Sequence, residues 1–336
     1  MRKTDLCWMI LILSSCLPQG DRISHDIREE SVSENRDLQI LDTSYLVLAS
    51  SSGSFEASGS AVSTPILLPS TTGSFGVLRA ATHAYDLQAS GNNVISQLRR
   101  PRDSLYCLTD RSLELSLTYH YKPKSGSGDT GKDFYERNQG LLTDQDDRTP
   151  AFQLGKGGYG RASVDFDFQE VVWIQDVETL GRFYYTDNYI DAAEAFTSLD
   201  CKEFSEFGVG YAPKRAHLHR NQLYTLKISE SPRRARCVRL VWHKPYTGSN
   251  HFSVTEVKIF GRPEPSQRVV FRSRSAATPE GFSLSPWSRS EWSEPFRSGD
   301  PIPSPPNRYL QYQVSIERFS PTLSPSLSEV TVEVGF

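Results

Sequence analysis

An acidic segment near the middle of the chain holds the residues best suited to bind a divalent cation. Asp144, Asp146 and Asp147 lie close together, and Thr149 follows them. Carboxylate and hydroxyl oxygens are hard ligands of the kind that Ca²⁺ prefers. An EF-hand is excluded, because the glycine at the sixth position of that loop and the glutamate at the twelfth are missing. Two interpretations stay open: a cation site and a solvated acidic turn.

A second segment, residues 242–252, has side chains suited to sugar recognition. A pyranose has an apolar face that packs on an aromatic ring, and its hydroxyls need planar hydrogen-bonding partners. The segment supplies an indole, two imidazoles, a phenol and an amide, from Trp242, His243, Tyr246, Asn250 and His251. We predict a ligand site here, with Arg148, Tyr159 and Tyr185 as its neighbours.

Motifs of the common catalytic classes are missing. Residues 155–160 match the G-x-G-x-x-G spacing, but a strand pattern follows them instead of the helix that a dinucleotide site requires. A glycine-rich hairpin connection is the better interpretation. The chain has no G-x-S-x-G, H-E-x-x-H or C-x-x-C motif. The sequence therefore favours binding over catalysis.

Short alternating segments must position these groups. In Val164–Phe168 the apolar residues fall on one face and two aspartates on the other, which is the period of a half-buried strand. Ser112–Tyr119 alternates in the same way. Many such segments, polar turns and no convincing long helix predict an all-β sandwich or jelly roll.

Five motifs in order make the middle of the chain resemble the discoidin family, also called the coagulation factor five/eight type C domain. Glycine is usual in that family where Gln145 and Cys201 stand, and tyrosine is usual where Cys237 stands. The matching segments are Leu142–Asp146, Val164–Gln169, Ser198–Phe204, Ala235–Leu240 and Thr255–Gly261. The resemblance implies a galactose-binding-like jelly roll over residues 101–262.

The resemblance also implies a site. Members that bind sugars often hold one structural Ca²⁺ between the early loop and the glutamate of the last strand. Carried over, the ligands are Asp144, Asp146, Thr149 and Glu256, with Asp147 as a substitute. Because Gln145 replaces a glycine, the loop must accommodate a side chain where positive φ is easiest for glycine. The family binds ligands through loops at one end of the jelly roll, which implies a glycan or cell-surface ligand.

The segments on either side of residues 101–262 are each too short for a complete sandwich. Residues 55–100 and 266–336 could form one smaller β-sandwich into which the discoidin-like domain is inserted, or two separate modules. We prefer the insertion. Residues 17–54 are interpreted as a solvated tether. The predicted strands are Ala61–Leu68, Phe75–Ala81, Asn93–Arg99, Arg268–Arg274, Arg308–Ile316 and Ser328–Val334.

The N-terminus predicts export. Arg2 and Lys3 precede the apolar run Leu6–Leu13, which is too short to span a bilayer as a mature helix. Residues 1–16 are therefore interpreted as a signal, and Leu13–Cys16 resembles a bacterial lipobox, which would make Cys16 a lipidated membrane anchor. Beyond Cys7 and Cys16, three cysteines remain: Cys107, Cys201 and Cys237. At most one internal disulfide can form among them, so a disulfide scaffold is excluded.

Composition is that of an ordinary soluble protein, with a net charge of −3 and 11% aromatic residues. That charge excludes a nucleic-acid footprint, which needs a clustered basic surface. We therefore predict an exported, non-catalytic protein that recognises carbohydrate or a cell surface. One alternative is an accessory part of a carbohydrate-active hydrolase or lyase, or a small enzyme of that kind. The other is a structural envelope or adhesion protein that binds a protein partner.

Overall fold

The computed structural model describes residues 21–28, 32–41, 45–51, 54–69, 73–88, 97–99, 105–110, 113–123, 141–147, 151–154, 161–183, 190–214, 217–243, 252–282 and 292–335. The predicted export signal, with Cys16, lies outside these residues. Within the described residues the elements are strands and three short 3-10 helices: η3 (Leu141–Thr143), η5 (Pro265–Arg268) and η6 (Pro279–Gly281). Within the described ranges, none of the helices has the length and apolar content to cross a bilayer. The all-β prediction is confirmed.

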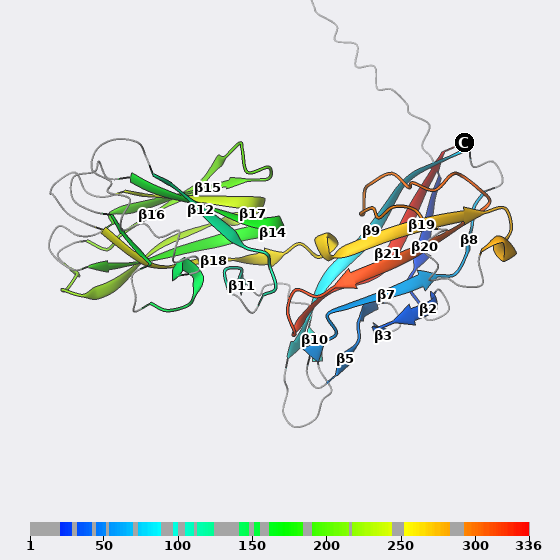
Figure 1. The fold of residues 1–336 in the computed structure, drawn as a ribbon, viewed down its shortest axis with the longest axis horizontal. Coiled ribbons are helices and arrows are strands. Elements are labelled where there is room, and N and C mark those ends of the chain that lie inside the picture. Colours follow the sequence, from blue (N-terminus) through cyan, green and yellow to red (C-terminus); the bar gives the residue numbers. More distant parts are fainter. Residues whose placement is uncertain are drawn as a thin grey trace, which may run out of the picture.

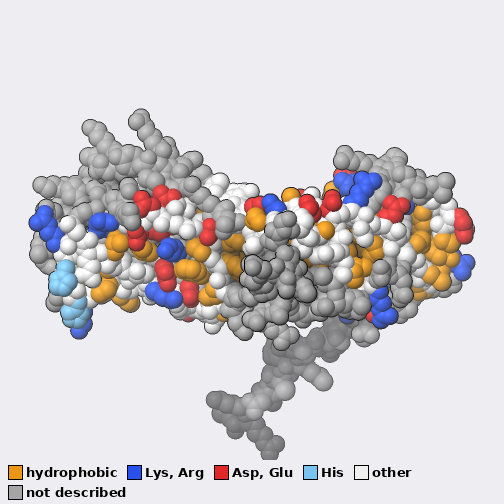
Figure 2. Space-filling model, turned by 90° about the horizontal axis from the view of Figure 1, so that it is seen from below, with side chains coloured by type: hydrophobic (Ala, Val, Ile, Leu, Met, Phe, Trp, Pro, Cys, Tyr) orange, Lys and Arg blue, Asp and Glu red, His pale blue; other side chains and the backbone are white. Residues whose placement is uncertain are grey.

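Two β-domains lie end to end (Figure 1). We call residues 105–263 the central domain, and residues 21–99 with 269–335 the split domain, because strands from both sides of the central domain pair in the same sheets. Along the long face in Figure 2, acidic and basic side chains are interspersed over the described parts of both domains.

The split domain consists of two main antiparallel sheets. One has the order β10 (Gln97–Arg99), β9 (Ser74–Gln88), β21 (Leu323–Gly335), β4 (Tyr45–Leu48), β3 (Leu38–Leu41), with β1 (Asp21–Asp26) also on β21. The other has the order β19 (Val269–Ala276), β20 (Tyr309–Glu317), β7 (Ser58–Ser63), β2 (Val32–Arg36), with β8 (Ile66–Leu67) also on β20. β5 (Ser50–Ser51) and β6 (Ser54–Phe55) form a separate pair. Each of the six segments predicted as strands here overlaps at least one of these strands.

The tether predicted for residues 17–54 is wrong over its described part, since β1 to β5 lie within it. Its polar composition reflects edge strands: β2 alternates little and keeps four exposed residues out of five. Its apolar residues still enter the shared core, where Ile27, Leu46 and Leu48 are buried against Phe271 and Leu310 from the other end of the chain. A charged segment can therefore add strands to a core that other segments dominate.

The central domain is an eight-stranded, curled antiparallel sheet, as expected for a jelly roll. Its order is β11 (Tyr106–Cys107), β18 (Phe252–Pro263), β14 (Arg161–Phe183), β17 (Gln222–His243), β15 (Ala192–Ser198), β16 (Ser205–Tyr211). β12 (Thr118–Pro123) pairs with β14, and β13 (Phe152–Leu154) pairs with β18. Val164, Phe166 and Phe168 are fully buried. The intervening Asp165 and Asp167 are paired with Arg239 and Arg236 at 2.6 and 2.9 Å, so the predicted alternation is confirmed.

Strand β14 folds back on itself, and so does β17. Their pairing shifts register between Asp167 and Val172. The first half of β14 pairs with the second half of β17, and the second half of β14 pairs with the first half of β17. Gln169, at the bend, has φ of 60°. Gly261 allows β18 to cross close to the returning arm, because a Cβ there would lie 1.8 Å from the Trp173 carbonyl oxygen. The bend lies at the junction with the split domain, so the free ends of both strands lie at the far end.

Side chains from one domain enter the other at the junction. Phe319 and Leu323, which follow β20, belong to the buried core of the central domain. Arg268 Nη2 contacts Glu170 Oε1 at 2.7 Å, and Arg318 Nη2 contacts Glu114 Oε1 at 2.8 Å. The segment around Glu114 is not the strand predicted for Ser112–Tyr119: its ladder pairing starts at Thr118. Before that, the amides of Leu115 and Leu117 bond to carbonyls two residues back.

Candidate functional site at the distal end of the central domain

The far end of the central domain, which we call the distal end, gathers the segments that the sequence analysis singled out. Arg161 pairs with His243, which pairs with Ala192, which pairs with Tyr211. Phe183 pairs with Gln222, and Gly181 pairs with Val254. Residues 155–160, 184–189 and 244–251 therefore connect to strands at this end, on the left of Figure 1. The split domain lies at the opposite end and leaves the distal end uncovered by the described residues.

Several predicted site residues lie outside the described residues. They are Arg148, Thr149, Tyr159, Tyr185, Tyr246, Asn250 and His251. For these residues the prediction rests on the positions of the strand ends that flank them.

Trp242 is a core residue, which corrects its predicted role as an exposed sugar platform. Its side chain is fully buried, and its indole Nε1 donates to Thr179 Oγ1 at 3.1 Å. The alternation of β17 explains this, since Val238, Leu240 and Trp242 point into the core while the residues between them point outward. The indole therefore stabilises the fold and cannot stack on a ligand.

Tyr211 supplies the exposed aromatic ring that Trp242 does not. Tyr211 is 74% exposed. It pairs with Ala192 of β15, and Ala192 pairs on its other edge with His243 of β17. Directly opposed residues in antiparallel strands share a face, so the Tyr211 and His243 side chains share the outer face of the sheet. His243 Nε2 lies 3.0 Å from Glu194 Oε2. The sequence analysis missed Tyr211 and Glu194; the alternation of β15 and β16 was the signal that could have found them.

The acidic segment is folded against Glu256 of β18. Asp144 Oδ1 accepts a hydrogen bond from the Asp146 amide at 2.9 Å, and the Gln145 amide donates to Glu256 Oε1 at 3.3 Å. Arg182 Nη2 donates to the Asp147 carbonyl at 3.1 Å, which fixes the far side of the loop. The loop and the last strand thus meet as the resemblance implies.

The charge of Glu256 is only partly compensated by its surroundings. The residue is 1% exposed, and its Oε2 has no hydrogen-bond partner among the described residues. Burial, together with the nearby Asp144 carboxylate, raises the pKa of Glu256 to about 8. A buried carboxylate beside a second one either takes up a proton or is balanced by a cation. The arrangement therefore fits a hard divalent ion.

Carboxylates alone do not complete such a site. Among the described residues, the only three ligating side chains within 4.8 Å of one another are Asp167, Cys201 and Cys237, and the two sulfur atoms of that group are joined to each other. A cation at Asp144 and Glu256 would need further oxygens, from backbone carbonyls or from Thr149.

The two cysteines that depart from the family pattern are bonded to each other. Cys201 and Cys237, which replace the usual glycine and tyrosine, form a disulfide with a Cα–Cα distance of 5.3 Å. Cys107 is the remaining free thiol among the described cysteines. Cys201 keeps the left-handed conformation suited to glycine, with φ of 62°, and Gln145 does the same with φ of 65°. Both residues therefore adopt the backbone conformation that is easiest for glycine, the usual residue of the family at these positions.

Comparisons with known proteins give fold neighbours only. No family model matches the chain, and no curated protein matches it. Solved structures that resemble it include the C-terminal domain of a chitobiase from Bacteroides fragilis, with 16% identity, TM-score 0.33, and coverage of 48% of this chain and 99% of that one. Another is the family 32 carbohydrate-binding module of Clostridium perfringens NanJ in complex with galactose, with 9% identity, TM-score 0.33, and coverage of 47% and 99%. A third is the same type of module from AlyQ in complex with 4,5-unsaturated mannuronic acid, with 17% identity, TM-score 0.29, and coverage of 43% and 93%.

Proposed function

We propose that this protein is a non-catalytic carbohydrate-binding protein whose central domain binds glycan at its distal end. One observation carries the proposal: the exposed Tyr211 ring shares a face with the His243–Glu194 pair, at the end where the predicted loops attach. An aromatic ring accepts the apolar face of a pyranose, and a carboxylate and an imidazole bond to its hydroxyls. The predicted residues Arg148, Tyr159, Tyr185, Tyr246, Asn250 and His251 would complete the site.

We further propose that one structural Ca²⁺ fastens the acidic loop to the last strand. Glu256 and Asp144 would supply carboxylate oxygens, and Asp146 and Thr149 the remaining side-chain ligands. A bound cation would offset the remaining charge of Glu256. It would also hold the loop that leads to Arg148, so its effect on glycan binding would be indirect.

The proposed location is outside the cytoplasm. The Cys201–Cys237 disulfide supports it, because disulfides persist in oxidising compartments and are rare in the cytosol. The basic and apolar N-terminus supports export, and lipidation of Cys16 would anchor the protein to a membrane. Radiolabelled palmitate incorporation into the wild-type chain but not into Cys16→Ala would test the anchor.

The function is tested by thermal unfolding of the mature protein with EDTA, with Ca²⁺, and with Ca²⁺ plus pooled plant and algal oligosaccharides or galactose. A ligand that binds only the folded state raises the melting temperature by mass action. We expect a Ca²⁺ shift that Glu256→Ala removes, and a further shift from at least one glycan pool. No shift from any glycan, together with capture of a protein partner, would instead support an adhesion role.

The enzymatic alternative has a separate test. If the chain were a small hydrolase or lyase, a glycan pool that stabilises it would be shortened on long incubation. We expect the glycans to be recovered unchanged, as judged by mass spectrometry. Shortened products that persist after removal of trace contaminants would contradict a purely binding role.

A further inference from the structure

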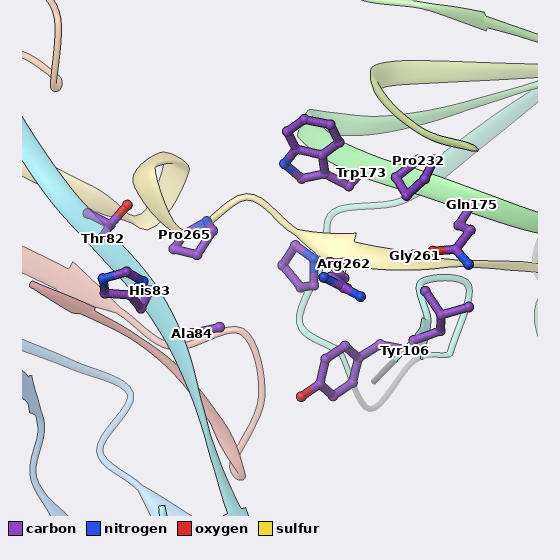
Figure 3. A pocket seen from close by; sticks show the side chains of 12 residues that line it. Thr82, His83, Ala84, Tyr106, Trp173, Gln175, Pro232, Gly261, Arg262 and Pro265 are labelled. Carbon is purple, nitrogen blue, oxygen red and sulfur yellow. The ribbon is translucent and has the colours of Figure 1, made fainter. Parts of the chain in front are cut away.

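A cavity lies where the two domains meet, far from the distal end. Its volume is about 460 Å³, within the usual size range of small-molecule sites. Both domains line it, and Figure 3 shows Trp173 on one side, Tyr106 on another and His83 facing them across the gap. Its lining residues are Thr82, His83, Ala84, Leu105, Tyr106, Trp173, Gln175, Pro232, Gly261, Arg262, Pro263 and Pro265.

The junction cavity has a positively charged side chain in its lining and no negatively charged one. Arg262 lies among the lining residues, which include no acidic side chain. Its Nε is buried, and no hydrogen bond or ion pair joins the Arg262 side chain to another described residue. The nearby Glu264 is already engaged, since it accepts from Trp173 Nε1 at 2.9 Å and from Ser266 Oγ at 3.2 Å, and lies 3.6 Å from Arg234 Nε. An incompletely paired cation in a largely apolar cavity favours an anionic ligand.

The side chains that line the junction cavity are suited to bind a sugar ring. The bond to Glu264 holds the Trp173 indole in place, so its orientation does not depend on a ligand. Tyr106 and three prolines add rigid apolar surface, and Gln175 and Thr82 add hydrogen-bonding groups. Rigid aromatic surface with a few polar groups is the arrangement that binds a sugar ring. A guanidinium adds selectivity, because its planar fork matches a carboxylate.

We propose that the junction cavity is a second carbohydrate site that takes an acidic sugar, a uronic acid residue, whose carboxylate pairs with Arg262 and whose ring packs against Trp173. The site goes beyond the glycan binding proposed for the distal end and uses none of its residues. Since β9 supplies Thr82 and His83 while β14 and β18 supply Trp173 and Arg262, the site exists only when the two domains are docked. The ion pairs Arg268–Glu170 and Arg318–Glu114 maintain that docking.

The test is calorimetric titration of the full mature chain with oligogalacturonate, with its methyl ester as the neutral counterpart and with inorganic phosphate as a simple anion. We expect the uronate to bind, and the ester and phosphate to bind at least tenfold more weakly. Arg262→Gln should weaken uronate binding at least tenfold. Arg22→Gln is the matched control, because it removes the same charge from a side chain that is 72% exposed on β1 of the split domain; it should change binding less than twofold.

A second measurement detects binding in the wild-type chain itself. In the wild-type chain, oligogalacturonate should shift the indole resonance of Trp173 and the ring resonances of His83, with Trp173→Phe assigning the indole signal. Tyr211→Ala should leave these shifts intact, which separates this site from the distal one. The proposal is overturned if the uronate does not bind, if its ester binds equally well, if Arg262→Gln folds and binds normally, or if the shifts lie elsewhere.

Discussion

Removal of the Cys201–Cys237 disulfide should weaken the central domain by a calculable amount. The two cysteines are separated by 36 positions. Closing a loop of that length lowers the entropy of the unfolded chain by about 13 cal/mol/K, equivalent to about 4 kcal/mol at 25 °C in the chain-entropy account. The double variant Cys201→Ser/Cys237→Ser should therefore lose about 4 kcal/mol of unfolding free energy. Its melting temperature should fall by roughly 8–16 °C, as expected for a domain of this size.

The backbone of Cys201 provides an internal comparison. Because this residue has φ of 62°, a side chain there costs roughly 1–2 kcal/mol relative to glycine. Cys201→Gly/Cys237→Ser should therefore be more stable than Cys201→Ser/Cys237→Ser by roughly that amount, although both lack the disulfide.

The assay is urea unfolding followed by fluorescence, with and without dithiothreitol. Cys107→Ser is the matched control, because Cys107 is the free, partly buried thiol; its variant should respond to dithiothreitol as the wild type does. Dithiothreitol should destabilise the wild type and leave both double variants unchanged. Equal stability of wild type and double serine variant, or a glycine variant no more stable than the serine one, would refute the reasoning.

Three further predictions concern the loop, the junction and the core. In EDTA, the free energy of unfolding should fall as pH rises from about 5 to about 8. Folding raises the pKa of Glu256 to about 8, so the folded state binds the proton more tightly than the unfolded state and loses this advantage as the group ionises. Glu256→Gln should flatten the dependence of unfolding free energy on pH, and an unchanged dependence would contradict the assignment. Phe319→Ala should lower the free energy of unfolding by about 3–5 kcal/mol and expose the junction to limited proteolysis, because Phe319 is fully buried in the core of the central domain. A loss of stability confined to the split domain would argue against a shared core. Trp242→Ala should cost a similar 3–5 kcal/mol in urea unfolding, since the indole is buried; a stable variant that had lost only glycan binding would restore the surface role rejected above.

Local patterns predict much of this fold because they are dictated by short-range alternation. Val164–Phe168 shows which face of a strand is buried, and the five ordered motifs indicate how the central strands are connected. The flanking segments are different, since β1 pairs with β21 across almost the whole chain. Pairing between segments so far apart is not visible in the sequence pattern of either segment. The polar strands before residue 55 are therefore interpreted as a tether when only the sequence is considered.

The candidate site was predictable in position but only partly in its members. Register decides which residues of a strand end face outward, and a shift of one residue exchanges the two faces. That is why the His243 side chain lies on the outer face of the sheet while Trp242, the more obvious sugar platform, is in the core. Tyr211 and Glu194 belong to the site only because β15 and β16 pair beside β17. Cys201, which follows β15, and Cys237 of β17 likewise become partners only because β15 pairs with β17.

The most direct test of glycan recognition at the distal end compares two exposed side chains at opposite ends of one sheet. Tyr211 is 74% exposed at the distal end, and Leu199 is 58% exposed just beyond the end of β15 nearest the junction. With the glycan identified by thermal unfolding, calorimetric titration of Tyr211→Ala should show affinity about tenfold weaker, a change of about 1.4 kcal/mol, with an unaltered melting temperature. Leu199→Ala should bind as the wild type does. Wild-type affinity in Tyr211→Ala, or equal losses in both variants, would contradict binding at the distal end.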